Sequence, residues 1–125
     1  MYMIGKPDFD WIKRSDGTSE FQDFIISLPI KDRAKLLKVI RDIEEYGMDI
    51  AAKMDWVSKI QGDIFEIRSR CGKQRQRALY FHEIENKYVI THGFTKKTEK
   101  TPSKEIEHAI AAMKKYKEGD KNDCY

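Results

Sequence analysis

The sequence predicts an α+β fold, in which a small, twisted, mostly antiparallel sheet carries an N-terminal helical hairpin and a C-terminal helix. Apolar residues recur at helical intervals over residues 20–46 and again over 103–113. Between these segments the period shortens to two, in runs joined by links of hairpin length. The first element is a short strand at residues 9–11, where apolar and polar residues alternate. The length of 125 residues fits one domain.

Two helices are expected after this strand. Ser19 and Gln22 have the spacing of a capping box, so the first helix runs roughly from Glu20 to Leu28. Pro29 can open a second helix at its first turn, and Gly47 is suited to cap its end. The junction at Pro29 would fold the two helices into a hairpin with one apolar side.

Three strands and a last helix follow. The strands are expected over residues 63–68, 77–82 and 88–94. The short links between them are of hairpin length, so neighbouring strands would run antiparallel. Residues 101–102, a threonine and a proline, begin the final helix, whose apolar face extends to Met113.

Composition argues against several classes of protein. No apolar run approaches the roughly 18 residues of a membrane span, and the N-terminus lacks the features of a signal peptide. Cys71 and Cys124 give no disulfide framework, and the three histidines lack close metal-ligand spacing. We therefore expect a cytoplasmic protein that uses no metal or other cofactor and does not bind a membrane.

Positive charge is concentrated in the second half of the chain. Residues 59–104 hold 11 basic and 5 acidic side chains, although the net charge of the whole chain is only +3. The basic residues form two clusters, Arg68, Arg70, Lys73, Arg75 and Arg77, and then Lys96, Lys97, Lys100 and Lys104. Such clusters on neighbouring elements favour a polyanion such as nucleic acid. The alternative is a solvated turn with a charged flank.

The residue types in this region suit RNA cleavage by attack of a 2′-hydroxyl on the adjacent phosphate. Arginine binds phosphate through a planar fork, and lysine stabilises negative charge. His92 could transfer a proton near neutral pH, and Tyr80 could stack a base. Each residue also has a structural alternative: Arg68 could simply pair with Glu66, His92 could be a buried structural histidine, and Tyr80 could pack in the core.

Residues 92–109 resemble the HGFxKKTxKTPxxEIExA signature of HigB-like toxins, which belong to the RelE/ParE superfamily of type II toxin–antitoxin systems. Residues 65–68 are similar to that family's strand ending in ELR, and residues 77–81 to its RxxYF strand. The resemblance covers about residues 8–117. It implies a RelE-like fold for a single toxin domain over residues 1–125. Residues 119–125, which follow the last expected helix, are expected to form a flexible tail.

The resemblance also implies an activity and a set of partners. The activity would be that of a ribosome-dependent mRNA endonuclease (an mRNA interferase) that inhibits translation. A cognate HigA-like antitoxin with a helix-turn-helix domain would neutralise it. The ribosome and mRNA would be direct partners, and operator DNA would be reached only through the antitoxin.

Carried onto matching positions, the resemblance implies that Arg68, Arg77 and His92 are catalytic. The two arginines would stabilise the phosphorane, and His92 would transfer a proton. The RNA contacts expected around them are Arg70, Lys73, Arg75, Tyr80, Lys96 and Lys97. A gyrase-directed ParE-like toxin and a non-catalytic module that binds nucleic acid or a partner are the alternatives.

Overall fold

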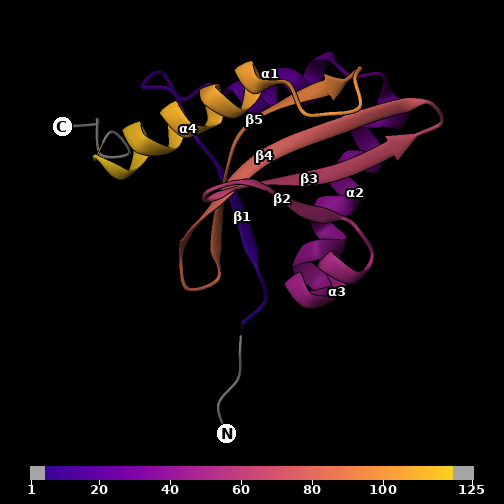
Figure 1. Cartoon of the computed structure of the whole chain (residues 1–125), viewed down its shortest axis with the longest axis horizontal. Helices are drawn as coiled ribbons and strands as arrows, with labels where there is room; N and C mark the ends of the chain where they lie inside the picture. The colour runs from indigo at the N-terminus through magenta and orange to yellow at the C-terminus, as the bar shows by residue number, and fades with distance from the viewer. Residues whose placement is uncertain (1–4, 120–125) are drawn as a thin grey trace, which may run out of the picture.

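The structure, a computed structural model, describes residues 5–119 and contains one five-stranded sheet between two layers of helices (Figure 1). The sheet has the strand order β1-β5-β4-β3-β2. The elements in chain order are β1 (Asp8–Trp11), α1 (Glu20–Ser27), α2 (Ile30–Tyr46), α3 (Met48–Lys53), β2 (Val57–Gln61), β3 (Ile64–Cys71), β4 (Gln74–Ile84), β5 (Lys87–Lys96) and α4 (Ser103–Lys117).

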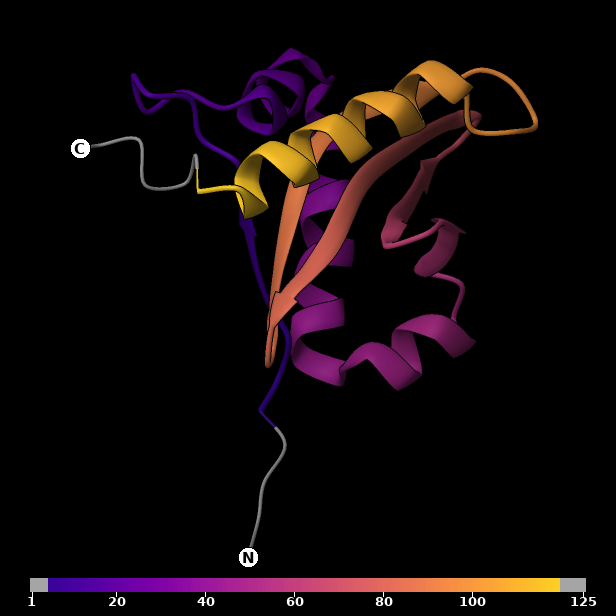
Figure 2. The same ribbon diagram turned by 60° about the vertical axis from the view of Figure 1, so that its left-hand side comes forward.

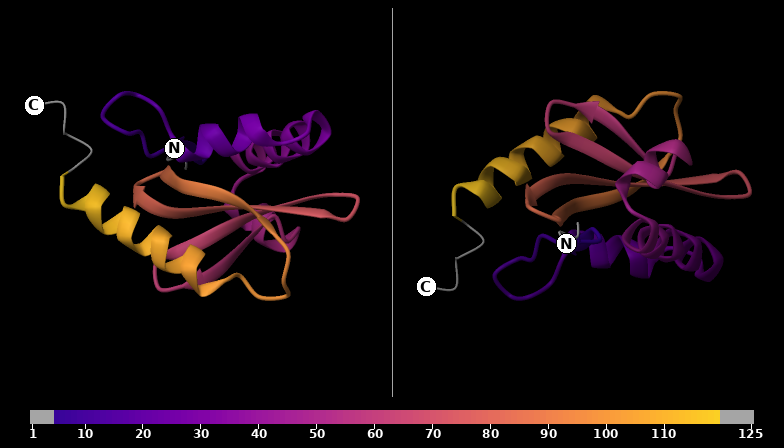
Figure 3. Two further views of the ribbon diagram at one scale, coloured as in Figure 1. Left: turned by 90° about the horizontal axis from the view of Figure 1, so that it is seen from above. Right: turned by 90° about the horizontal axis from the view of Figure 1, so that it is seen from below.

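The helices cover both faces of the sheet. Helices α1, α2 and α3 lie on one side and α4 crosses the other, as Figures 2 and 3 show. Strand alternation creates the two apolar surfaces that the helices cover. The larger core includes Phe21, Leu36, Ile43, Ile67, Ala78, Tyr80 and Ile90. The smaller core, beneath α4, includes Ile64, Leu79, Phe81, Val89, Ala109 and Met113.

Side-chain hydrogen bonds fix both ends of α1. The Ser19 hydroxyl accepts hydrogen bonds from the backbone N–H groups of Phe21 and Gln22, as the capping-box spacing predicts. The Arg33 guanidinium, on α2, donates to three carbonyl oxygens at the other end of α1, those of Ile25, Ile26 and Leu28. Arg33 therefore holds the end of α1 against the first turns of α2.

A bulge in β5 changes which face its side chains reach. Tyr80 on β4 pairs with Ile90, whereas the preceding residue, Leu79, pairs with His92. Thr91 is therefore the extra residue of the bulge. Ile90 faces the α1–α3 side, and His92 faces the α4 side. Without the bulge, Ile90 and His92 would share a face.

The predicted fold class, and with it the RelE-like layout, is wrong. The sheet is mixed because β1 runs parallel to β5, and a helix and a strand that were not predicted, α3 and β2, lie between α2 and β3. Residues 5–119 contain no N-terminal helical hairpin, because α1 packs on β5 and α2 on β3. Each helix turns its apolar stripe towards the sheet because the sheet offers more apolar surface than the other helix.

Two further predictions concern the chain termini and the membrane. Cys124 and residues 120–125 of the expected tail lie outside the described residues. Over residues 5–119, no helix combines the length and the apolar character that crossing a bilayer requires.

Candidate functional site

An open cleft of about 350 Å³ lies on the α4 side of the sheet, where the β3–β4 hairpin meets the loop after β5. Its lining consists of Asp55, Arg68, Ser69, Arg70, Arg75, Arg77, Lys96 and Glu99. Five of these eight side chains are basic and two are acidic. The cleft therefore suits an anionic ligand.

Strand register places like charges directly opposite one another in this cleft. Arg68 pairs with Arg77, and Arg70 pairs with Arg75, across β3 and β4. Arg75 also pairs with Lys96 across β4 and β5. Like charges in directly opposite positions destabilise a sheet, so this arrangement favours a bound anion that relieves the repulsion.

Arg77 is the buried member of the cluster. Its side chain is only 4% exposed, and its Nη1 donates to the Gln76 carbonyl oxygen at 3.0 Å. Nε lies 3.6 Å from Glu66 Oε1 without a hydrogen bond to any described residue. Burial is the main cause of a lowered Arg77 pKa; Glu66 opposes it, and Arg68 and the other arginines reinforce it. An arginine remains charged at neutral pH all the same.

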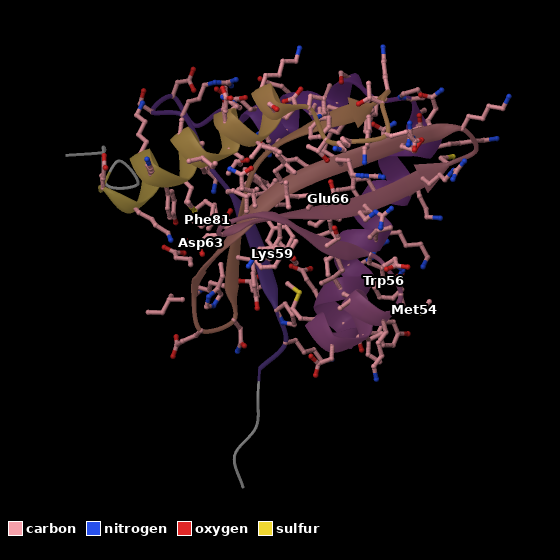
Figure 4. All side chains as sticks on the ribbon, viewed as in Figure 1. Met54, Trp56, Lys59, Asp63, Glu66 and Phe81 are labelled. Atoms are coloured by element: carbon pink, nitrogen blue, oxygen red, sulfur yellow. The ribbon has the colours of Figure 1, made fainter. Side chains whose placement is uncertain are left out.

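Glu66 is the buried carboxylate that pairs with two arginines of the cleft. Its carboxylate is 5% exposed and lies between Arg77 and Arg68, with Oε2 3.8 Å from Arg68 Nε. The Thr101 hydroxyl, just before α4, donates to Oε1 at 3.2 Å. Glu66 lies on β3, next to the edge strand β2 (Figure 4), and is not part of the cleft lining. The carboxylate therefore positions the cations without facing the cleft.

The sequence alone indicates Glu66 only as an ion-pair partner of Arg68. A stronger signal was present in the spacing, because residues two apart on a strand share a face. Glu66, Arg68 and Arg70 therefore form one row on β3. The spacing does not predict the register of β3 and β4, which brings Arg77 close to the same carboxylate.

Lys96 lines the cleft, and its surroundings there lower its pKa. Burial is the first cause of its lowered pKa; Glu66 raises the pKa, and Arg77 and the other arginines lower it further. A lysine with a lowered pKa can donate a proton more readily. Nearby, Asp55 has a backbone φ of 60°, a left-handed conformation that is uncommon for a residue other than glycine.

His92 lies on the same face of the sheet but does not line the cleft. Its Nδ1 contacts the Thr91 hydroxyl at 2.9 Å, and its Nε2 contacts Glu105 Oε1, on the first turn of α4, at 2.9 Å. Its ring centroid is 4.6 Å from that of His108, whose Nε2 in turn contacts Glu20 on α1. His92 therefore joins β5 to α4.

We expect His92 to make folding stability depend on pH. Burial is the main cause of its lowered pKa, His108 adds to it, and the hydrogen bond and charge of Glu105 and the charge of Glu20 oppose it. The unfolded chain then binds the proton more tightly than the folded protein. The stabilisation is present above the ordinary pKa of 6.5 and is lost as the pH falls through the lower folded value. Urea unfolding between about pH 7.5 and about pH 5 measures this loss.

The control for this experiment is His92→Gln, which can still donate to Glu105 but does not titrate. Its stability should fall less than that of the wild type over the same pH range. Parallel profiles for the two proteins would show that His92 is not the group responsible.

The other residues that were predicted to contact RNA lie at separate places around the sheet. Tyr80 is buried on the α1–α3 side, where its ring lies 5.2 Å from that of Phe9 and 5.7 Å from that of Phe65. Lys73 is exposed in the β3–β4 turn, and Lys97 is exposed just after β5. The structure thus brings Arg68, Arg70, Arg75, Arg77 and Lys96 together, and it places Tyr80 on the opposite face from them.

Metal-ligating side chains are not grouped in the part of the chain that the structure describes. No three His, Cys, Asp or Glu residues of that part are placed so that they could hold a metal ion.

Comparison with known proteins corrects the resemblance. The model of a protein family described as "Phage derived protein Gp49-like" matches residues 23–114. No curated protein matches the chain. The identification with HigB-like toxins of the RelE/ParE superfamily is wrong, because the matching family is a different one. The signature at residues 92–109 lies inside the matched range, so this sequence pattern does not by itself distinguish the two families.

Proposed function

The chain belongs to the family of phage-derived Gp49-like proteins, and on this premise we propose that it is the toxin of a toxin–antitoxin system, an endoribonuclease that cuts mRNA. The family is associated with toxin–antitoxin systems, which supports the first part of the proposal. The cationic cleft supports the second part. Cutting mRNA would inhibit translation.

The observation that carries the proposal is the set of like-charge pairs across three neighbouring strands. Arg68 faces Arg77, and Arg75 faces both Arg70 and Lys96. Single-stranded RNA offers closely spaced phosphates that would neutralise several of these cations at once. A merely solvated charged surface gives no reason to bury Arg77 beneath the others.

The chemistry we assign to the cleft is attack of a 2′-oxygen on the adjacent phosphorus. Arg68 and Arg77 bind the non-bridging oxygens, whose negative charge grows in the transition state. The bond to the 5′-oxygen breaks as the cyclic phosphate forms, and Lys96 gives this leaving oxygen a proton. The 2′-hydroxyl proton passes to water in the open cleft. Glu66 and His92 act as positioning residues behind the reacting groups.

The proposal also includes partners. The ribosome would present mRNA to the cleft, and a cognate antitoxin with a helix-turn-helix domain would neutralise the toxin. Operator DNA would then be bound only through that antitoxin. The excess of cations in the cleft supports a polyanionic substrate.

We expect expression of the wild-type chain to arrest growth and to cut translated transcripts. The double variant Arg68→Ala/Lys96→Ala should lower cleavage by at least about 100-fold, since it removes two groups that act on the developing charge. Primer extension on transcripts after induction measures cleavage, and purified protein with and without ribosomes tests their requirement. Lys59→Ala removes one exposed lysine outside the cleft and should cut like the wild type.

Two results would contradict the proposal. One is full cleavage by the double variant, which would place the active site elsewhere. The other is growth arrest with intact transcripts and inhibited gyrase in a supercoiling assay, which would make the chain a gyrase-directed toxin.

A further inference from the structure

A second surface, outside the cleft lining, exposes large aliphatic side chains on neighbouring turns of helix. Ile30, Ala34 and Leu37 recur at helical spacing along α2, opposite its buried stripe. Ile30 is 78% exposed and Leu37 is 41% exposed. Ile26, at the end of α1, is 68% exposed. We call these four residues the α2 outer face; exposed apolar patches of this kind mark interaction sites more often than chance.

Unbalanced positive charge flanks this face. Lys31, Lys35, Lys38 and Arg41 follow the apolar stripe along the first three turns of α2. Lys38 pairs with Asp42 at 2.7 Å. Over residues 5–119, the other three cations form no ion pair.

The acidic groups further along α2 already have partners. Glu44 accepts a hydrogen bond from the Phe9 backbone N–H at 2.8 Å, and Glu45 pairs with Lys6 at 3.2 Å. A second copy of the chain would therefore have to break these contacts before its α2 could neutralise the lysines. The unpaired cations favour an external acidic partner instead.

We propose that the α2 outer face is a docking site for an acidic amphipathic helix of a protein partner. Such a helix would set its apolar side chains on Ile26, Ile30 and Leu37 and its carboxylates against the lysine flank. Burial of the aliphatic stripe favours protein over RNA, since phosphate oxygens gain nothing from contact with isoleucine or leucine.

The face is rigid before the partner arrives. Arg33 fixes the end of α1 to α2 through its hydrogen bonds to the carbonyls of Ile25, Ile26 and Leu28. On its other side, α2 is anchored in the larger core through Leu36 and Ile43. A surface that needs no ordering upon binding loses less entropy.

Helices α2 and α4 lie on opposite faces of the sheet (Figures 2 and 3). The docking site is on α2, whereas the cationic side chains that line the cleft belong to the face of α4. A bound helix would therefore leave the cleft open. This inference goes beyond the proposed nuclease activity. Evidence against the docking site would leave the nuclease proposal intact.

The probe is a fluorescein-labelled synthetic helix of about 18 residues, with leucines at helical spacing and glutamates beside them. The control peptide has lysine in place of every glutamate. We expect the acidic peptide to bind the wild-type protein in fluorescence anisotropy and the basic peptide to bind at least about tenfold more weakly. Ile30→Ser/Leu37→Ser should weaken the acidic peptide at least about tenfold. Transcript cleavage by this variant should stay unchanged.

A charge exchange makes the test sharper. Lys31→Glu/Lys35→Glu should reverse the preference, so that the basic peptide binds better than the acidic one. Arg70→Ala/Lys73→Ala, on the hairpin, is the matched control and should keep the preference of the wild type. Thermal melting of each variant verifies that it is folded.

Four outcomes would overturn the proposal. The acidic peptide could show no binding to the wild type, or affinity that neither pair of α2 variants changes. Labelled RNA could bind through Lys31 and Lys35 without any effect of Ile30→Ser/Leu37→Ser, which would make this an RNA-binding face. Sedimentation could reveal a dimer that the same aliphatic variant dissolves, which would make the occupant a second copy.

Discussion

Replacing Arg77 by lysine should lower transcript cleavage by about 100- to 1,000-fold while the protein stays folded. Lysine keeps the positive charge that faces the buried Glu66 carboxylate, so the ion pair of these two side chains survives. The single nitrogen of lysine cannot both replace Nη1, which donates to the Gln76 carbonyl oxygen, and offer a phosphate oxygen the second donor that Nη2 provides. In the wild type, no described residue forms a hydrogen bond with Arg77 Nη2, which leaves this group for substrate.

The measurement is the rate of transcript cleavage by purified protein, with urea unfolding as the test of folding. Arg41→Lys is the matched control, because it makes the same change on α2, outside the cleft, and should cut at the wild-type rate. Arg77→Ala should lose both cleavage and stability, since it leaves Glu66 buried without its closest cation. If Arg77→Lys cut as fast as the wild type, Arg77 would contribute only its positive charge and not a specific hydrogen bond to the phosphate.

Elements with local signals could be predicted from the sequence. Helix α1 begins after Ser19, whose capping spacing is visible in the chain, and the Ser19 hydroxyl makes the expected bonds. The β3–β4 and β4–β5 hairpins follow from short links between alternating runs. Helix α4 begins at Ser103, directly after the expected threonine and proline.

Elements that depend on distant parts of the chain could not be predicted. The parallel pairing of β1 with β5 brings Phe9 opposite Tyr88, and no turn signal records a contact over that separation. Strand β2 is polar at several positions because it lies at the edge of the sheet, so its sequence lacks a clean alternation. The prediction of a helical hairpin was wrong because an apolar stripe indicates that one face of a helix is buried, but it does not identify the element that buries this face.

The candidate site was predictable in composition but not in geometry. The clusters that contain Arg68, Arg77 and Lys96 are visible in the sequence as an excess of charge. That they face one cleft follows from register, which depends on the length of the β3–β4 turn. The bulge at Thr91 places the His92 side chain on the side of α4. No residue pattern in the sequence predicts this bulge.

Replacing Glu66 should separate its structural role from its role in catalysis. Glu66→Ala leaves Arg77 buried without a counter-charge and should cost about 3–5 kcal/mol of folding stability. Glu66→Gln keeps the shape and can still accept the hydrogen bond from Thr101, so it should cost less. Urea unfolding measures both values. Glu99→Gln removes an exposed carboxylate of the same cleft and should change stability by less than about 0.5 kcal/mol.

The pH dependence of cleavage by Glu66→Gln tests whether Glu66 acts through Lys96, whose pKa it raises. Glu66 raises the pKa of Lys96, so its loss should lower that pKa further. If Lys96 donates the proton to the leaving oxygen, the fall in rate at high pH should begin at a lower pH in the variant than in the wild type. An unmoved high-pH limb would show that Lys96 is not the proton donor.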